Sequence, residues 1–364
     1  MFRLILALAA LIASPALAAP WPTTEGDFVA RDVRFGTGET MAEVRIHYTT
    51  LGTPHRDAKG QIDNAVMVLH GTGGSGKNFL VPQFADELYG PGAPLDLANT
   101  YVILPDNIGH GGSSKPSDGL RMAFPRYDYD DMVALQHLLL VEGLGITRLK
   151  LILGTSMGCM HAFVWGETFP GFAERLAPFA CNPVPLAGRN RMWRKMAIDA
   201  IKADPAWANG AYTSQPAAGV RTVADLLILA GLNPIAAQTQ FPTRAATEAA
   251  LDTAFARASR IDANDALYYI DSSRNYDPSG ALEKITVPVL WINSADDFIN
   301  PPELGFAEKA VRRMPRARFI LIPASADTKG HGTHTWAKFW KADLAKLLAQ
   351  KAFGPPLPPA AAAR

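Results

Sequence analysis

Gly154-Thr155-Ser156-Met157-Gly158 spells G-x-S-x-G and follows the apolar, β-prone run Leu149 to Leu153. A helical stretch, Cys159 to Phe169, comes directly after it and ends at Pro170-Gly171. A strand that turns sharply into a helix over small residues holds a serine in a strained, exposed position. The two glycines let the backbone approach its neighbours more closely than a β-carbon would permit. The segment therefore predicts a nucleophile, Ser156, at a strand–turn–helix junction.

Two apolar stretches further along the chain lead into residues that could activate this serine. Val287 to Asn293 reads as a buried strand and runs into Ser294-Ala295-Asp296-Asp297, and Ala317 to Pro323 leads into Gly330-His331. The carboxyl ends of parallel strands meet at one edge of a sheet, where such folds place their sites. We expect neutral His331 to take the Ser156 proton, while a buried aspartate fixes the tautomer of the imidazole.

Backbone amides for a developing oxyanion can also be located. One donor should be Met157, the residue after the nucleophile, and the other should lie in the turn after an early strand. Ala65 to Leu69 is such a strand and ends in His70-Gly71-Thr72-Gly73-Gly74, where Thr72 is the expected donor. Each preorganised donor is worth about 3 kcal/mol. The D-x-x-G-x-G-x-S segment from Asp106 to Ser113 is interpreted as scaffold, not chemistry.

Together these motifs resemble the α/β-hydrolase superfamily, and specifically its homoserine O-acetyltransferase-like branch. The resemblance extends from about residue 30 to about residue 345 and includes, besides the serine motif, these segments: Phe124-Pro125-Arg126, Ala200-Ile201, Asp204-Pro205-Ala206-Trp207, Ile261-Asp262-Ala263-Asn264 and Asp297-Phe298-Ile299-Asn300-Pro301-Pro302-Glu303. It implies a mostly parallel central sheet flanked by helices, with an inserted helical cap. The branch's pattern D-x-L-x-P-P-E falls on Asp297, which makes Asp297 the expected acid in preference to Asp296.

Two departures from the branch bear on the substrate. Its acyltransferases typically carry an acidic residue directly after the catalytic histidine, where this chain has Gly332, and an arginine where this chain has Ile198. The turn HGTGG is likewise hydrolase-like. We therefore expect hydrolysis of a carboxylic ester or related acyl compound through an acyl-serine. The alternatives are an O-acyltransferase of the homoserine O-acetyltransferase type and a non-catalytic binding protein of the same fold.

Composition sets the organisation of the chain. With 364 residues, of which 48% are hydrophobic, the chain can bury a large core. Its net charge of +1 does not produce the strong positive potential that favours binding of nucleic acid. The partner we expect is a small-molecule acyl substrate. Residues 184–282 are too many for a loop and carry alanine-rich helical stretches, so we expect a helical cap between two core segments, 19–183 and 283–352. A homodimer through the cap is left open, and residues 353–364, rich in Pro and Ala, should be disordered.

The N-terminus reads as a secretion signal. Met1-Phe2-Arg3 is positively charged, Leu4 to Ile12 is apolar, and Ala16-Leu17-Ala18 forms a small-residue cleavage site, so residues 1–18 are predicted to be removed on export. The apolar run falls short of the ~20 residues that span a bilayer, which argues against stable membrane insertion. The expected location is periplasmic or secreted.

Three other patterns suggest chemistry that we do not expect. The stretch Gly71 to Asn78 nearly matches a phosphate-binding loop, but Asn78 stands where a hydroxyl should bind Mg²⁺. His331 and His334 have no nearby Glu or Cys set for a metal, so neither a metal nor a cofactor is predicted, and His334 is expected beside the site or on the surface. Cys159 and Cys181 could pair in an oxidising compartment, although two buried thiols are the favoured interpretation.

Overall fold

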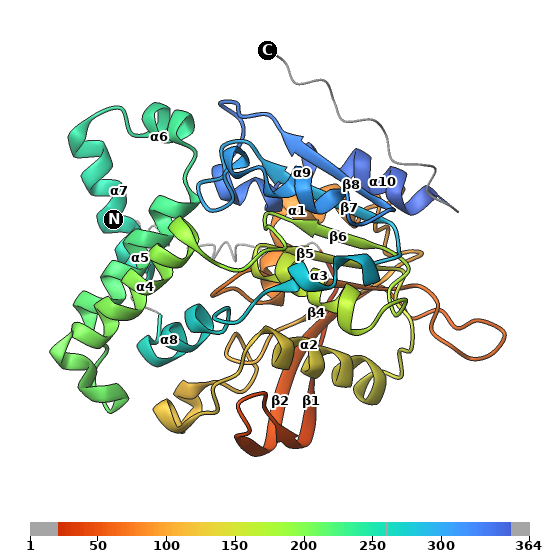
Figure 1. Ribbon diagram of the computed structural model, residues 1–364, viewed down its shortest axis with the longest axis horizontal. Coiled ribbons are helices and arrows are strands. Elements are labelled where there is room, and N and C mark those ends of the chain that lie inside the picture. The colour runs from red at the N-terminus through yellow and green to blue at the C-terminus, as the bar shows by residue number, and fades with distance from the viewer. Residues whose placement is uncertain (1–20, 259–260, 351–364) are drawn as a thin grey trace, which may run out of the picture.

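An eight-stranded sheet forms the centre of the computed structural model, which describes residues 21–258 and 261–350 (Figure 1). The strands lie in the order β1-β2-β4-β3-β5-β6-β7-β8; β1 and β2 run antiparallel to each other, β2 runs antiparallel to β4, and the other neighbours are parallel. Their bounds are β1 Thr24–Arg34, β2 Thr40–Leu51, β3 Ala65–Leu69, β4 Tyr101–Pro105, β5 Leu151–Thr155, β6 Leu176–Phe179, β7 Val289–Ser294 and β8 Ala317–Ile322. The predicted signal peptide, 1–18, and tail, 353–364, lie outside the described residues.

Helices cover both faces of this sheet. One core cluster packs α2, α3 and α9 against one face, and a second packs α1 and α10 against the other. The bounds are α1 Pro82–Leu88, α2 Tyr129–Leu138, α3 Met157–Thr168, α9 Phe306–Val311 and α10 Lys341–Ala349. Every residue of β3, β5, β6 and β7 is buried, which explains why these strands read as unbroken apolar runs in the sequence.

The strand before the serine lies slightly later in the chain than its sequence suggests. The predicted run Leu149 to Leu153 becomes β5, Leu151–Thr155, because Leu149 forms only an isolated bridge with Ala173 while pairing with β6 continues to Thr155. The helix after it begins at Met157, two residues before the predicted start. Ser156 is therefore the single residue between strand and helix.

In the described part of the chain, five α-helices lie between β6 and β7 and gather on one side of the sheet (Figure 1). They are α4 Gly188–Ala203, α5 Ala217–Gly231, α6 Pro234–Gln240, α7 Arg244–Ala258 and α8 Ala263–Asp271. These helices are called the cap below, and three of them, α4, α5 and α8, share a hydrophobic cluster that includes Ile201, Val223 and Ile270. Asn233 at the N-cap and Pro234 in the first turn give α6 a recognisable start signal in the sequence.

No single helix within residues 21–258 and 261–350 is long and apolar enough to cross a membrane. Over the same described ranges, one pair of helices, α5 and α6, passes that test when the two are joined, and the pair is bent by 109° at its break.

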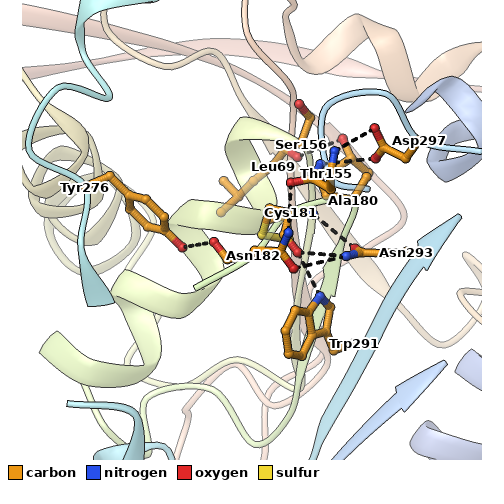
Figure 2. The surroundings of a disulfide bond; sticks show 12 residues. Leu69, Thr155, Ser156, Ala180, Cys181, Asn182, Tyr276, Trp291, Asn293 and Asp297 are labelled. Atoms are coloured by element: carbon orange, nitrogen blue, oxygen red, sulfur yellow. Dashed lines mark hydrogen bonds between the residues drawn. A yellow bond between two sulfur atoms is a disulfide. The ribbon is translucent and has the colours of Figure 1, made fainter. Parts of the chain in front are cut away.

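A disulfide joins the first turn of α3 to the end of β6. Cys159 and Cys181 are bonded, so the favoured interpretation of two free thiols is wrong. Their Cα atoms are 5.8 Å apart, a distance typical of disulfides. The pairing of β5 with β6 creates this proximity, which a separation of 22 residues in sequence does not reveal. Figure 2 shows the Cys181 carbonyl accepting hydrogen bonds from Trp291 Nε1 and Asn293 Nδ2 on β7.

Removing this disulfide should destabilise the fold. A cross-link that closes a loop of 22 residues restricts the unfolded chain, so the variant Cys159→Ala/Cys181→Ala should lose about 3 kcal/mol of unfolding free energy in urea titrations. Alkylation and mass measurement of the unreduced wild-type protein provide the control. Two alkylated thiols in that sample, with equal stability of the double variant, would contradict the bond.

Candidate active site

Ser156 occupies a strained backbone position at the carboxyl edge of the sheet. Its φ is 54° and its ψ −111°, a conformation that non-glycine residues rarely adopt. The predicted role of the flanking glycines is confirmed: a β-carbon on Gly154 would lie 1.9 Å from the Gly158 carbonyl oxygen, and one on Gly158 would lie 2.1 Å from that of Leu69. The turn is thus held against β3, and the Ser156 N–H donates to Phe179 O at 2.8 Å.

The structure brings Ser156, His331 and Asp297 together from three separate strand ends. His331 Nε2 lies 2.8 Å from Ser156 Oγ, and His331 Nδ1 lies 2.8 Å from Asp297 Oδ2. The Asp297 side chain is fully buried and that of His331 is 11% exposed. Since the carboxylate can only accept at Nδ1, it selects the tautomer in which Nε2 is free to accept the serine proton.

Asp297 is built to remain ionised. It accepts hydrogen bonds from the backbone N–H groups of Ile299, at 2.7 Å, and Asn300, at 3.1 Å, and from Asn300 Nδ2 at 3.1 Å. Burial by itself raises the pKa of Asp297, but the neighbouring His331 and the hydrogen bonds from Asn300 outweigh it and hold the pKa below its ordinary value. Asp296 has different partners and does not reach the His331 ring. Of the two candidate acids, the one that contacts the ring is Asp297.

Both predicted oxyanion donors are free. Within the described residues, neither the Thr72 N–H nor the Met157 N–H has an acceptor. The loop that carries Thr72 is fixed against the serine turn, because Gly158 N donates to His70 O at 3.0 Å. A β-carbon on Gly71 would lie only 3.2 Å from Ser156 Cβ, so the loop passes directly beside the serine. Two unsatisfied amides next to one serine suit a developing negative oxygen.

The segment after β4 serves the loops around the site. Asp106 accepts from Gly76 N at 2.6 Å and from Gly112 N at 2.8 Å, and so joins two loops. His70 Nε2 accepts from Asn107 N at 3.1 Å. These contacts agree with the interpretation of this segment as scaffold.

The buried histidines near the site stay neutral. Burial lowers the pKa of His70 and of His161, and it lowers the pKa of His110 to about 3. His334 is partly buried against the His331 ring, with centroids 5.1 Å apart; burial and the neighbouring His331 lower its pKa to about 3. His334 is therefore beside the site, and not on the surface.

Two polar side chains near the site have no counterpart in the sequence interpretation. Tyr129 opens α2 and is 1% exposed, yet its hydroxyl has no hydrogen-bond partner within the described residues. Burial raises the pKa of Tyr129, while the Arg194 guanidinium and the hydroxyls of Ser273 and Thr72 partly offset this increase. Arg194 is itself 2% exposed. Within residues 21–258 and 261–350, no carboxylate forms an ion pair with its guanidinium.

Arg194 could have been found from helical spacing. It lies four residues before Ile198 on α4, hence on the same side of the helix. Position 198 is the one where the resemblance leads us to expect an arginine. Its guanidinium donates to Asn190 Oδ1 at 3.1 Å and to the Ile270 carbonyl at 3.3 Å. It therefore ties α4 to α8 beside Tyr129.

The structure offers no support for the phosphate-loop or metal alternatives. Lys77 is exposed and pairs with Glu25 at 2.7 Å. Among the described residues, no group of three or more His, Cys, Asp or Glu side chains could hold a metal ion.

A groove of about 840 Å³ lies next to Asp297, between the cap and the loop after β7. Its lining is largely apolar. It includes Leu229 of α5, Leu232 directly after α5, and Phe298 of the loop. Met160 also lines it, one turn of α3 after Ser156. The groove thus adjoins the residues that surround the acid.

Comparison with known proteins agrees with this geometry. Residues 64–328 match the family described as the alpha/beta hydrolase fold, and the chain belongs to that family. Its relatives include a probable acyltransferase of Methanothermobacter thermautotrophicus, 29% identical over 83% of this chain and 92% of the relative. Another is a homoserine O-acetyltransferase of Pelobacter propionicus, 28% identical over 75% of this chain and 82% of the relative. The chain is thus similar to the homoserine O-acetyltransferase-like branch.

Solved structures share the fold. A homoserine O-acetyltransferase from Bacillus anthracis superposes with a TM-score of 0.80 at 22% identity, covering 92% of this chain and 99% of that structure. An acetylester hydrolase from Corynebacterium glutamicum superposes with a TM-score of 0.78 at 20% identity, covering 90% and 96%. Transferases and hydrolases are therefore both found on this architecture.

The pH dependence of turnover should not depend on titration of Asp297 or His334. The low pKa values of Asp297 and His334 keep the first ionised and the second neutral between about pH 5 and pH 8. Within this range kcat/KM on an activated ester should fall toward acid with the slope of a single proton, since protonated His331 cannot accept the serine proton. The variant His334→Gln should keep the same profile. A flat profile, with acylation limiting the rate, would contradict the role of His331 as base.

Proposed function

We propose that this protein is an exported serine hydrolase that cleaves a carboxylic ester or a related acyl compound through an acyl-serine intermediate. The observation that carries the proposal is the hydrogen-bonded chain from Asp297 through His331 to Ser156 Oγ, with both contacts at 2.8 Å. The strained turn that presents Ser156 beside two free amides supports the same chemistry.

The proposed reaction has two halves. Ser156 Oγ attacks the carbonyl carbon of the ester while His331 Nε2 takes the hydroxyl proton, and the ionised Asp297 stabilises the resulting imidazolium. The carbonyl oxygen becomes negative and accepts hydrogen bonds from the N–H groups of Thr72 and Met157. His331 then returns its proton to the leaving alkoxide, which departs as the alcohol and leaves an acyl ester on Ser156.

In the second half, water is the nucleophile. His331 removes a proton from the water as it attacks the acyl carbon, and the proton then passes to Ser156 Oγ as the carboxylic acid leaves. An O-acyltransferase differs only in that an organic alcohol replaces this water. The choice depends on what the site can hold and exclude.

The side chains at positions 332 and 198 favour water over a zwitterionic alcohol. Gly332 has no carboxylate for an ammonium group, and Ile198 has no guanidinium for a carboxylate. Arg194 lies one turn away, but its guanidinium is already engaged by Asn190 Oδ1 and the Ile270 carbonyl. An amino-acid acceptor would lose its hydration without gaining charged partners, which costs several kcal/mol per ion.

The proposed periplasmic or secreted location rests on residues 1–18 and is supported by the disulfide between Cys159 and Cys181. Disulfides persist in oxidising compartments and are rare in the reducing cytosol.

Loss of the nucleophile should abolish turnover without unfolding the protein. Ser156→Ala removes no core volume, and a triad acts as a unit, so kcat on an activated ester should fall by about 10⁴-fold. Asp297→Asn should be similarly damaging, because it favours the wrong tautomer of His331, and Asp296→Asn should be far milder. The reverse order of the two aspartates would move the acid to position 296.

A fluorophosphonate probe separates the enzyme from a silent binding protein of the same fold. It should label the wild-type protein at Ser156 and leave Ser156→Ala unlabelled. Absence of labelling in the folded wild type would point to the non-catalytic alternative.

Homoserine should be a poor acceptor. With an activated ester as donor, we expect release of the free acid at a rate that millimolar homoserine does not increase, and little activity with acetyl-CoA. Product analysis by mass spectrometry measures both routes in one reaction. Formation of O-acetylhomoserine faster than hydrolysis would establish the acyltransferase alternative instead.

A further inference from the structure

One buried asparagine of the cap reaches into the part of the core that carries His331. Asn233 lies between α5 and α6 and is 3% exposed. Its Oδ1 accepts from Ala236 N at 3.0 Å and so caps α6. Its Nδ2 donates to Asp296 Oδ2, at 2.7 Å, on the loop after β7. A single side chain therefore begins a cap helix and contacts the residue next to the acid.

Asp296 extends this contact to the segment just before His331. Besides Asn233, its Oδ2 accepts from Thr328 Oγ1 at 2.8 Å and from Gly330 N at 3.1 Å. Asn233 Nδ2 is also 2.9 Å from the Thr328 carbonyl oxygen. The carboxylate thus holds the backbone of the residue that directly precedes His331.

The cap and this segment also touch through their backbones. Gly330 has a φ of 57°, and a β-carbon there would lie 2.6 Å from the carbonyl oxygen of Leu232. Leu232 and Asn233 form the junction between α5 and α6. Because no side chain fits between them, a shift of this junction has to be transmitted to Gly330.

From these contacts we propose that Asn233 is a positioning residue for His331, acting through Asp296 and Gly330. The inference rests on the proposed function, since it assigns a cap residue to the geometry of the base. Asp297 orients the ring of His331. Asp296 fixes the backbone of Gly330, the residue before His331, and through Asn233 it links the position of this backbone to the cap. An error of about 1 Å in such a geometry costs on the order of 100-fold in rate.

The variant Asn233→Ser tests this directly. Serine keeps an N-cap oxygen for α6 but has no amide to reach Asp296. We expect kcat on an activated ester to fall by about tenfold with KM changed less than about twofold, and labelling of Ser156 by the fluorophosphonate to slow by the same factor as kcat. Thermal unfolding checks that the fold is kept.

A matched control is Asp204→Ser, also in the cap. Asp204 caps a helical turn through Ala206 N, at 2.9 Å, and joins it to α5 through Gly219 N, at 3.0 Å, without contacting the His331 loop. It should retain wild-type kcat. Equal loss in this control would show that any loosening of the cap suffices, and would overturn a specific role for Asn233.

A reciprocal exchange tests the pairing itself. Asn233→Asp places two carboxylates face to face and should reduce kcat more than Asn233→Ser does. Combining it with Asp296→Asn removes the repulsion between the two carboxylates, so the double variant should recover part of the kcat lost in Asn233→Asp; recovery is incomplete because a carboxylate at position 233 still faces the carbonyl oxygens of Ser325 and Thr328. A double variant no better than Asn233→Asp would overturn the proposal.

The isosteric variant Thr328→Val removes the hydroxyl of the same network from the opposite side and should lower kcat with little change in KM. It replaces Asn233→Ser as the decisive test should that variant fail to fold. If Asn233→Ser folds and keeps the kcat and the labelling rate of the wild type, the positioning role of Asn233 is overturned, but the proposed function is not. Failure of the wild type to react with the probe would instead overturn the proposed function, whatever the Asn233 variants do.

Discussion

The close approach of β3, β5 and α3 is the constraint on which the site depends. Two glycines make it possible, since a β-carbon on Gly154 or on Gly158 would lie about 2 Å from a carbonyl oxygen, at 1.9 Å and 2.1 Å. This packing leaves one residue, Ser156, to reverse the chain at a φ of 54°. The same geometry frees the Met157 N–H and places Cys159 over the end of β6. The proposed nucleophile, one proposed oxyanion donor and the disulfide thus share a single structural cause.

The electrostatics around the serine keep the neighbours of His331 at fixed charge. Burial keeps neighbouring imidazoles neutral, among them His110 and His334, whose pKa values are lowered to about 3. The hydrogen bonds to Asp297 keep that carboxylate ionised. The proposed base, His331, is thereby surrounded by groups of fixed charge.

The sequence could predict the residues that follow strand ends, because a local pattern is enough to place them. Ser156, Asp297 and His331 each follow an apolar run, at distances of up to about eight residues, and parallel strands bring such ends to one edge. Features that depend on packing between elements far apart in the chain could not be predicted from the sequence. Tyr129 and Arg194 meet from α2 and α4, and Cys159 meets Cys181 only once β5 and β6 pair. Asn233 was missed for the same reason: its N-cap role is local, but its second contact is 63 residues away.

The two adjacent aspartates show how the cap and the core could share one site. Asp297 accepts only from the core, at Ile299, Asn300 and His331, and its geometry would survive a change in the cap. Asp296 accepts from Asn233 of the cap and from Gly330 of the core, so it bridges the two. The ring of the base is therefore oriented by one part of the protein and its backbone is anchored to the other. Because the cap also forms one wall of the apolar groove beside Asp297, a substrate that moves this wall would act on the same contact that positions the base.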